Sequence, residues 1–141
     1  MTEFIWIDTS FLYALFARAD INHTNAESIW KQILSKGITG VISNLILAEL
    51  GTLLAYRFGH STAASRIGMV LDSTIIRRVY VDSDIESGAL AWWRTFGDQS
   101  FSFPDCVSFE IMRRTGMRRA LSYDKDFGVA GFEPVRSALG L

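Results

Sequence analysis

The chain has 141 residues, a net charge of −1 and a hydrophobic content of 49%. This length fits a single domain over residues 1–141, and the apolar content is sufficient for a packed core, which excludes a disordered chain. The near-neutral charge balance gives no general indication of nucleic-acid binding.

Strand and helix patterns alternate along the chain. The elements predicted in the first half are a strand at Phe4–Ile7, a helix from Thr9 or Ser10 to Ala17, a helix over Thr24–Ser35, a strand at Thr39–Ser43, a helix capped by Asn44 and running to Phe58, and a helix over Ser61–Leu71. Those of the second half are an edge strand within Ile75–Val81, a helix from Asp82 or Ser83 to Phe96, a helix from about Pro104 to Arg114, a strand at Arg119–Ser122 and a last short strand at Pro134–Arg136. This alternation predicts an α/β fold, a three-layer α/β/α sandwich with a mostly parallel central sheet.

The sequence offers no sign of secretion or membrane insertion. The apolar N-terminal segment is short, lacks a basic start, and is flanked by Glu3 and Asp8. No apolar run approaches the ~20 residues of a membrane span. The single cysteine, Cys106, cannot form a disulfide within the chain, which favours a reducing compartment. We therefore expect a cytoplasmic protein with no membrane association.

Four acidic residues lie in or beside apolar segments, where carboxylates are uncommon: Asp8, Glu49, Asp105 and Asp124. An unpaired buried carboxylate costs several kcal/mol, roughly, so such groups are normally paired, protonated or bound to metal. Asp8 and Asp124 follow predicted strands, and Glu49 and Asp105 lie near the start of predicted helices. In a parallel sheet these positions all belong to the carboxyl edge, where ligands bind. The sequence therefore predicts that the four acids meet.

Clustered carboxylates repel one another, and a divalent cation relieves that repulsion. Ligands that are all oxygen favour Mg²⁺ or Mn²⁺ over zinc. A metal site of this kind is suited to phosphate chemistry.

The segments around these acids resemble the motifs of the PIN domain family. They are Ile7-Asp8-Thr9-Ser10, Ser43–Leu50, Ser102–Cys106 and Leu121–Phe127, in the order and close to the spacing found in that family. The resemblance implies a metal-dependent endoribonuclease in which metal-activated water hydrolyses RNA, usually the toxin of a VapC-type toxin–antitoxin pair. Asp8, Glu49, Asp105 and Asp124 would then be the metal-site residues, with Asp126 as a second candidate in the last motif. Thr9 or Ser10 would support Asp8, and Ser122 stands where the family commonly has Thr.

The resemblance also implies partners. PIN toxins generally form homodimers and bind an antitoxin near the acidic site, where an Arg or Lys of the antitoxin could replace the charge of the metal. The many aliphatic residues of Leu45–Leu71 also predict an exposed patch for a partner, because they cannot all face one small core.

Other interpretations stay open at this point. Asp8 and Asp105 also fit helix-capping roles, Glu49 fits an ion pair with Arg57 or Arg66, and Cys106 fits a small buried side chain better than a nucleophile. The pairs Arg77-Arg78, Arg113-Arg114 and Arg118-Arg119 suit either phosphate contacts or solvated edges. At the level of function, the alternatives are a non-catalytic RNA- or protein-binding PIN-like module and, less well supported, a phosphoaspartate phosphatase or a receiver-like domain.

Overall fold

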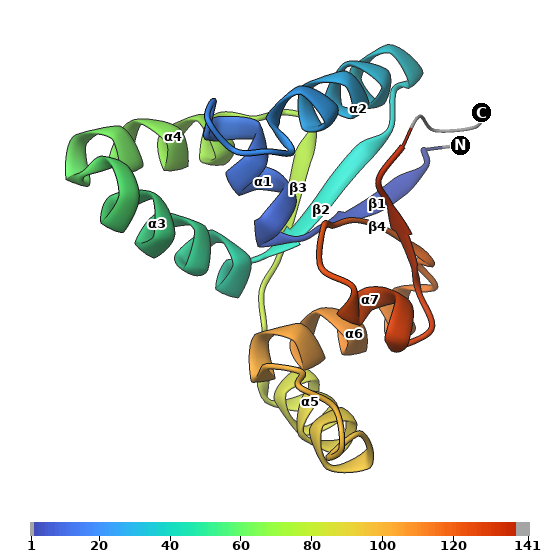
Figure 1. Cartoon of the computed structure of the whole chain (residues 1–141). Coiled ribbons are helices and arrows are strands. Elements are labelled where there is room, and N and C mark those ends of the chain that lie inside the picture. The colour runs from blue at the N-terminus through green and yellow to red at the C-terminus, as the bar shows by residue number, and fades with distance from the viewer. Residues whose placement is uncertain (1, 138–141) are drawn as a thin grey trace.

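Five short parallel strands form the sheet at the centre of the computed structural model, which describes residues 2–137 (Figure 1). The strands are β1 (Phe4–Ile7), β2 (Thr39–Ser43), β3 (Ile76–Val79), β4 (Arg119–Leu121) and β5 (Glu133–Val135). Their order across the sheet is β3-β2-β1-β4-β5, and all four neighbouring pairs are parallel. From β1, the chain adds β2 and then β3 on one side of β1, and it then crosses to add β4 and β5 on the other side of β1. The point between β1 and β4 is therefore a topological switch point, where parallel sheets bind ligands.

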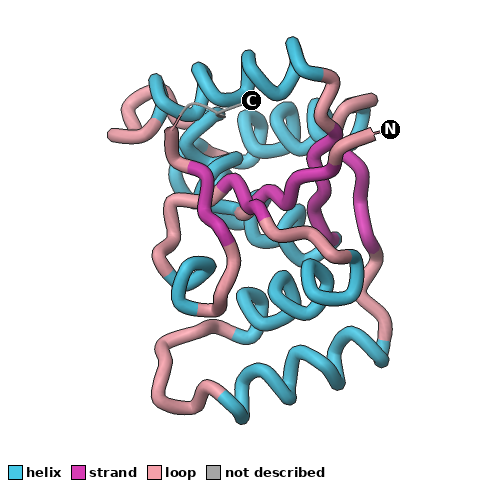
Figure 2. The backbone as a smooth tube through the Cα atoms, turned by 90° about the vertical axis from the view of Figure 1, so that its right-hand side faces the viewer, coloured by secondary structure: helices cyan, strands magenta, loops and turns pink. Residues whose placement is uncertain are grey.

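Helices cover both faces of this sheet (Figures 1 and 2). One layer consists of α1 (Thr9–Phe16), α2 (His23–Lys36), α3 (Asn44–Phe58) and α4 (His60–Asp72), and the other consists of α5 (Ser83–Thr95), α6 (Phe103–Thr115) and the short α7 (Asp126–Val129). The predicted three-layer α/β/α fold is confirmed. In the described part of the chain, no helix is both long enough and apolar enough to cross a membrane.

The apolar character of β1 follows from its position at the centre of a sheet that is covered on both faces. Ile5, Trp6 and Ile7 are all fully buried, so the strand is a continuous apolar run rather than an alternating one. On the α5–α6 side, the ring of Phe109 packs edge-on against Phe127 of α7. This contact ties α7 to α6, and the two helices carry acids of the predicted site.

Three local features differ from the sequence prediction. Asp8, rather than Thr9 or Ser10, is the N-cap of α1, in line with the alternative capping role of Asp8. Ser43, rather than Asn44, caps α3, because its hydroxyl accepts a hydrogen bond from the amide of Ile46. The side chain of Asn44 instead accepts one from the amide of Val81, and so links α3 to the segment after β3. The helix α7 was not predicted, because four residues are too few to show a helical period.

The arginine pairs are largely engaged within the fold. Their contacts are Arg113 and Arg114 with Glu110, Arg119 with Glu3, Arg77 over the ring of Phe4, and Arg78 over the ring of Tyr80. These contacts favour structural roles over dedicated phosphate contacts.

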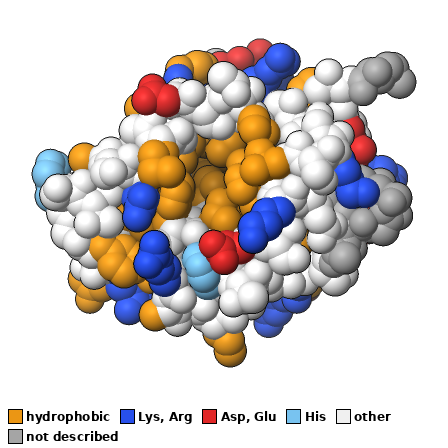
Figure 3. Space-filling view, turned by 90° about the horizontal axis from the view of Figure 1, so that it is seen from above, with side chains coloured by type: hydrophobic (Ala, Val, Ile, Leu, Met, Phe, Trp, Pro, Cys, Tyr) orange, Lys and Arg blue, Asp and Glu red, His pale blue; other side chains and the backbone are white. Residues whose placement is uncertain are grey.

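The predicted aliphatic patch is only partly exposed. Leu54 and Val70 are buried in the core, whereas Met69 and Leu71 remain on the surface. Met69 also borders an apolar hollow of about 370 Å³ among α1, α2 and α4. Figure 3 shows an apolar depression on this side of the molecule, with charged side chains around it.

Candidate active site and metal centre

The four acids predicted from the sequence line one cleft at the carboxyl edge of the sheet. Asp8 follows β1, Asp124 follows β4, Glu49 lies in the second turn of α3, and Asp105 lies in the first turn of α6. The cleft has a volume of about 780 Å³ and is also lined by Thr9, Ser10, Ala48, Thr52, Leu53, Tyr56 and Ser102. Topology therefore brings together side chains that are far apart in sequence, as predicted.

Asp8 is a buried carboxylate held by two hydroxyl groups. Its Oδ2 accepts hydrogen bonds from Ser10 Oγ at 2.6 Å and from Ser122 Oγ at 3.0 Å. Burial raises the pKa of Asp8 and outweighs the opposite effect of these hydrogen bonds, and the nearby charge of Asp124 raises it further. A cation in the cleft would favour the ionised form of Asp8.

The two serines also fix the chain that follows β4. Ser10 Oγ accepts a hydrogen bond from the amide of Tyr123 at 3.0 Å, and Ser122 Oγ accepts one from the amide of Asp124 at 2.9 Å. Each hydroxyl donates to Asp8 and accepts from this segment. The predicted supporting roles of Ser10 and Ser122 therefore have a geometric basis.

Thr9 has a different partner from the one the sequence suggested. Its hydroxyl donates to Glu49 Oε1 and joins α1 to α3, so it does not support Asp8. Glu49 is exposed to the cleft, and among the described residues it forms no ion pair with Arg57 or Arg66. Of the two residues expected to support Asp8, Ser10 donates a hydrogen bond to it and Thr9 does not. The ion-pair interpretation of Glu49 is wrong.

Asp105 is held in place by a capping box at the start of α6. Its Oδ2 accepts from the amide of Ser102 at 3.1 Å, and its own amide donates to Ser102 Oγ at 3.1 Å. Burial, together with the charges of Asp124 and Asp8, raises the pKa of Asp105 to about 6 against the effect of these bonds. The capping role of Ser102 was not predicted, although the spacing Ser102-x-x-Asp105 is a recognisable signal for such a cap.

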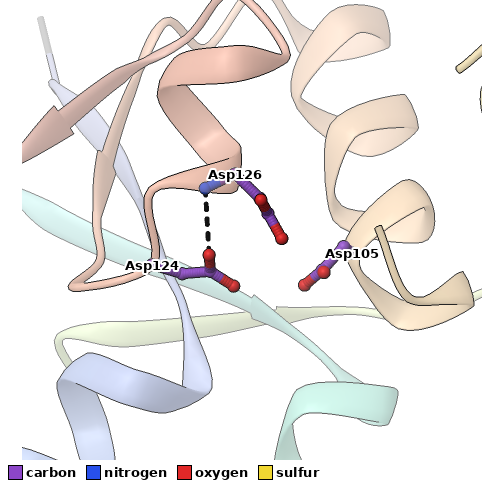
Figure 4. A group of neighbouring side chains, drawn as sticks. All are labelled: Asp105, Asp124 and Asp126. Carbon is purple, nitrogen blue, oxygen red and sulfur yellow. Dashed lines mark hydrogen bonds between the residues drawn. The ribbon is translucent and has the colours of Figure 1, made fainter. Parts of the chain in front are cut away.

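Asp105, Asp124 and Asp126 form the tightest acidic group in the described part of the chain. One carboxylate oxygen from each lies within 4.8 Å of the other two, and Figure 4 shows the three side chains converging. The amide of Asp126 donates to Asp124 Oδ1 at 2.9 Å. Burial and the charge of Asp124 raise the pKa of Asp126. Three oxygen donors at this separation fit a hard divalent cation.

Comparison with known proteins decides the family. Residues 5–133 match the family model described as the PIN domain. The chain belongs to the PIN domain family. The metal-dependent nuclease class expected from the sequence resemblance is supported by this membership, since PIN nucleases typically depend on divalent metal.

Relatives of this PIN domain include a characterised toxin. The chain is 38% identical over 132 residues to the 23S rRNA-specific endonuclease VapC20 of Mycobacterium tuberculosis. This alignment covers 94% of this chain and 98% of VapC20. The crystal structure of M. tuberculosis VapC20, described as a sarcin–ricin loop cleaving toxin, matches with a TM-score of 0.85 at 37% identity, again over 94% and 98% of the two chains. The ribonuclease class expected from the sequence is thereby confirmed.

A more distant match supports the fold alone. VapBC2 of Rickettsia felis, solved with a DNA fragment from its promoter, matches with a TM-score of 0.67 at 12% identity, over 95% of this chain and 98% of that one. The PIN architecture therefore persists where little sequence identity remains.

Within this PIN domain the tight acidic group differs from the predicted set of four. Asp8 and Glu49 line the cleft but are not members of the three-residue group, whereas Asp126 is a member. No Arg, Lys or His lines the cleft among the described residues. Cys106 is buried, and burial raises the pKa of its thiol to about 11, so it is unsuited to act as a nucleophile near neutral pH.

Proposed function

We propose that this chain is a Mg²⁺- or Mn²⁺-dependent endoribonuclease, acting as a single nuclease domain and as the toxin of a toxin–antitoxin pair. The observation that carries the proposal is the convergence of carboxylates from four separate segments in one cleft without a neutralising cationic side chain. An acidic cleft of this kind repels RNA phosphates by itself, so a bound cation is needed before the substrate can enter.

Asp105, Asp124 and Asp126 are the residues that would hold the cation most directly, with Asp8 and Glu49 completing the acidic lining. When bound, Mg²⁺ or Mn²⁺ lowers the pKa of a coordinated water and neutralises charge that develops at the phosphodiester. Ser10 and Ser122 hold Asp8 in position, Ser102 holds Asp105, and Thr9 holds Glu49. The protein's contribution is therefore to fix several carboxylates at one point, with no covalent enzyme intermediate.

The proposed substrate is ribosomal RNA at a single-stranded or loop region. This choice rests on the 38% identity to VapC20, which is named a 23S rRNA-specific endonuclease. The crystal structure of VapC20 is described as that of a toxin that cleaves the sarcin–ricin loop.

The test of substrate is incubation of purified protein with 23S rRNA and Mg²⁺ or Mn²⁺, with the cut mapped by primer extension. A synthetic sarcin–ricin stem-loop and the same nucleotides in a perfect duplex separate loop recognition from general cleavage. We expect one metal-dependent cut in the loop and none in the duplex. Cleavage that needs no divalent cation, or an intact RNA after incubation with folded protein, contradicts the proposal.

We also propose a homodimer in the cytoplasm that a small antitoxin inhibits. The apolar hollow among α1, α2 and α4, bordered by Arg18, Glu27 and Arg66, supports a protein partner, since exposed apolar concavities often mark such contacts (Figure 3). Light scattering of the isolated protein and pull-down from its native cells test the two parts. A monomer at micromolar concentration that recovers no small protein contradicts both.

A further inference from the structure

We propose that Tyr56 is a stacking platform for a nucleobase adjacent to the phosphate held at the acidic group. This inference rests on the proposed ribonuclease function and adds a base-binding subsite to it. The ligand class is an unpaired nucleotide of an RNA strand, recognised through its π face.

Tyr56 occupies the same cleft as the acids. It lies on α3, seven residues after Glu49, and Thr52 lies between them at a spacing of three. Residues spaced by three, four and seven share one face of a helix, so Glu49, Thr52 and Tyr56 line the cleft in successive turns. At 1.5 Å per residue, Tyr56 is roughly 10 Å along the helix axis from Glu49, a separation suited to a neighbouring nucleotide rather than to the reacting phosphate itself.

The ring of Tyr56 is free within the described protein. The residue is 84% exposed, and it forms no hydrogen bond and no aromatic contact with any other described residue. The next aromatic residue on α3 behaves differently, because Phe58 stacks on Tyr13. Tyr56 therefore presents both an apolar ring face and a hydroxyl to the cleft without a structural role that would explain them.

The charge distribution of the cleft strengthens this assignment. Proteins commonly hold single-stranded nucleic acid by pairing Arg or Lys with phosphates and by stacking bases on aromatic side chains. No Arg or Lys lines this cleft in residues 2–137, and the side chains of Arg113, Arg114 and Arg119 are engaged with carboxylates elsewhere. Tyr56 is therefore the one aromatic ring among the described residues lining the cleft on which a base beyond the metal-bound phosphate can stack.

The wall beside Tyr56 suits a base as well. Leu53 is half-buried and Ala48 is small, and both line the same cleft on α3. A flat base placed against the ring of Tyr56 would cover apolar surface without burying an unpaired charge. A protein partner that covers Tyr56 is the competing explanation, and the experiment below distinguishes it.

The test measures RNA binding separately from cleavage. Ca²⁺ replaces Mg²⁺ so that a cation still neutralises the acidic group while cleavage is slowed. A stem-loop RNA carries 2-aminopurine next to the mapped cut, because stacking on an aromatic ring quenches the fluorescence of this base. Four proteins are compared under these conditions: the parent (wild-type) protein, Tyr56→Phe, Tyr56→Leu and Tyr80→Leu. Tyr80 is the matched control, since it is an exposed tyrosine that does not line the cleft.

We expect Tyr56→Leu to weaken binding about 5- to 150-fold and to abolish the quenching, in line with the usual contribution of one base–aromatic stack. Tyr56→Phe keeps the ring and stays within about twofold of the parent, as does Tyr80→Leu. The inference is overturned if Tyr56→Leu and the parent protein bind the RNA with equal affinity and quench its fluorescence equally. It is also overturned if light scattering shows that Tyr56→Leu has changed its oligomeric state and that this change explains the lost binding. If wild-type protein cleaves RNA while Tyr56→Leu binds normally, only the stacking role fails; if wild-type protein neither binds nor cleaves RNA, the proposed function fails.

Discussion

Ser122 links the first and the last acid of the cleft through a single hydroxyl group. Its Oγ donates to Asp8 Oδ2 at 3.0 Å and accepts from the amide of Asp124 at 2.9 Å. Ser122 is fully buried, so neither contact can be replaced easily by water. Ser122 therefore adds a side-chain link between the end of β1 and the segment after β4, beside the backbone pairing of the two strands.

Substitution of Ser122 tests that link. Ser122→Ala removes a hydrogen bond to a buried carboxylate and should lower the free energy of unfolding by about 1–3 kcal/mol. Cleavage should fall roughly 10- to 100-fold, as is usual when a residue that orients metal ligands is lost. Ser35→Ala, which removes an exposed hydroxyl on α2, should change neither quantity. Chemical denaturation measures the free energy of unfolding, and single-turnover assays measure cleavage. Unchanged cleavage by folded Ser122→Ala would contradict the role of Ser122 in positioning Asp8 and Asp124.

Metal and pH should act together on stability. The pKa values of Asp8, Asp105 and Asp126 are raised in the folded protein, so above about pH 4 it binds more protons than the unfolded chain, and for Asp105 this window extends to about pH 6. The contribution of these groups to metal-free stability is therefore greatest at low pH and falls as pH rises through that window. A bound cation removes this penalty and stabilises the native state by linkage.

We expect Mn²⁺ to raise the melting temperature more at about pH 7.5 than at about pH 5.5, where protons compete for the carboxylates. Asp8→Asn should reduce the response, whereas Asp98→Asn, at an exposed acid outside the cleft, should not. Thermal melting with and without Mn²⁺ measures the effect. An equal response in wild type and Asp8→Asn would count against an acidic metal site.

The sequence predicted the positions of Asp8 and Asp124 well because each follows a strand of a parallel sheet, and such strands end at one edge. The contact of Thr9 with Glu49 was not predictable from local spacing, which offered Asp8 as the nearer partner. The membership of Asp126 in the tight group also needed three dimensions, since it depends on α7, a helix too short to show a period.

Asp124 and Asp126 should differ in importance. Asp124 lines the cleft and fixes the amide of Asp126, whereas Asp126 is largely buried beside it. We expect Asp124→Asn to reduce single-turnover cleavage at least about tenfold more than Asp126→Asn, because the carboxylate of Asp124 lines the cleft. A larger loss in Asp126→Asn would reverse the ranking.

Gly88 should be intolerant of a side chain because of Glu110. Glu110 is buried between α5 and α6, where it accepts hydrogen bonds from Arg113, Arg114 and Trp92. A Cβ at Gly88 would overlap the Glu110 carboxylate, which those bonds hold in place. This contact secures α5 on α6, the helix that carries Asp105.

Gly88→Ala should therefore destabilise the protein by about 1–3 kcal/mol. A Gly→Ala change inside a helix usually has the opposite effect and stabilises the protein. Gly68→Ala in α4, where a Cβ meets open space, should instead stabilise by up to about 1 kcal/mol. The cost at Gly88 should shrink in a Glu110→Ala background, which frees the space. Chemical denaturation of the single and double variants measures these values, and equal effects at Gly88 and Gly68 would rule out the clash.

If carboxylates in the cleft hold the cation needed for RNA cleavage, Asp105→Asn should remove cleavage without unfolding the protein. The substitution keeps the size of the side chain and an oxygen for the capping box with Ser102, so the fold should persist. Its cleavage of the RNA cut by wild type should be measured in Mg²⁺ and in Mn²⁺, with folding checked by thermal melting. We expect a properly folded variant that has lost cleavage by at least about a hundredfold in either metal. Full cleavage by a folded, nuclease-free preparation of Asp105→Asn would contradict it.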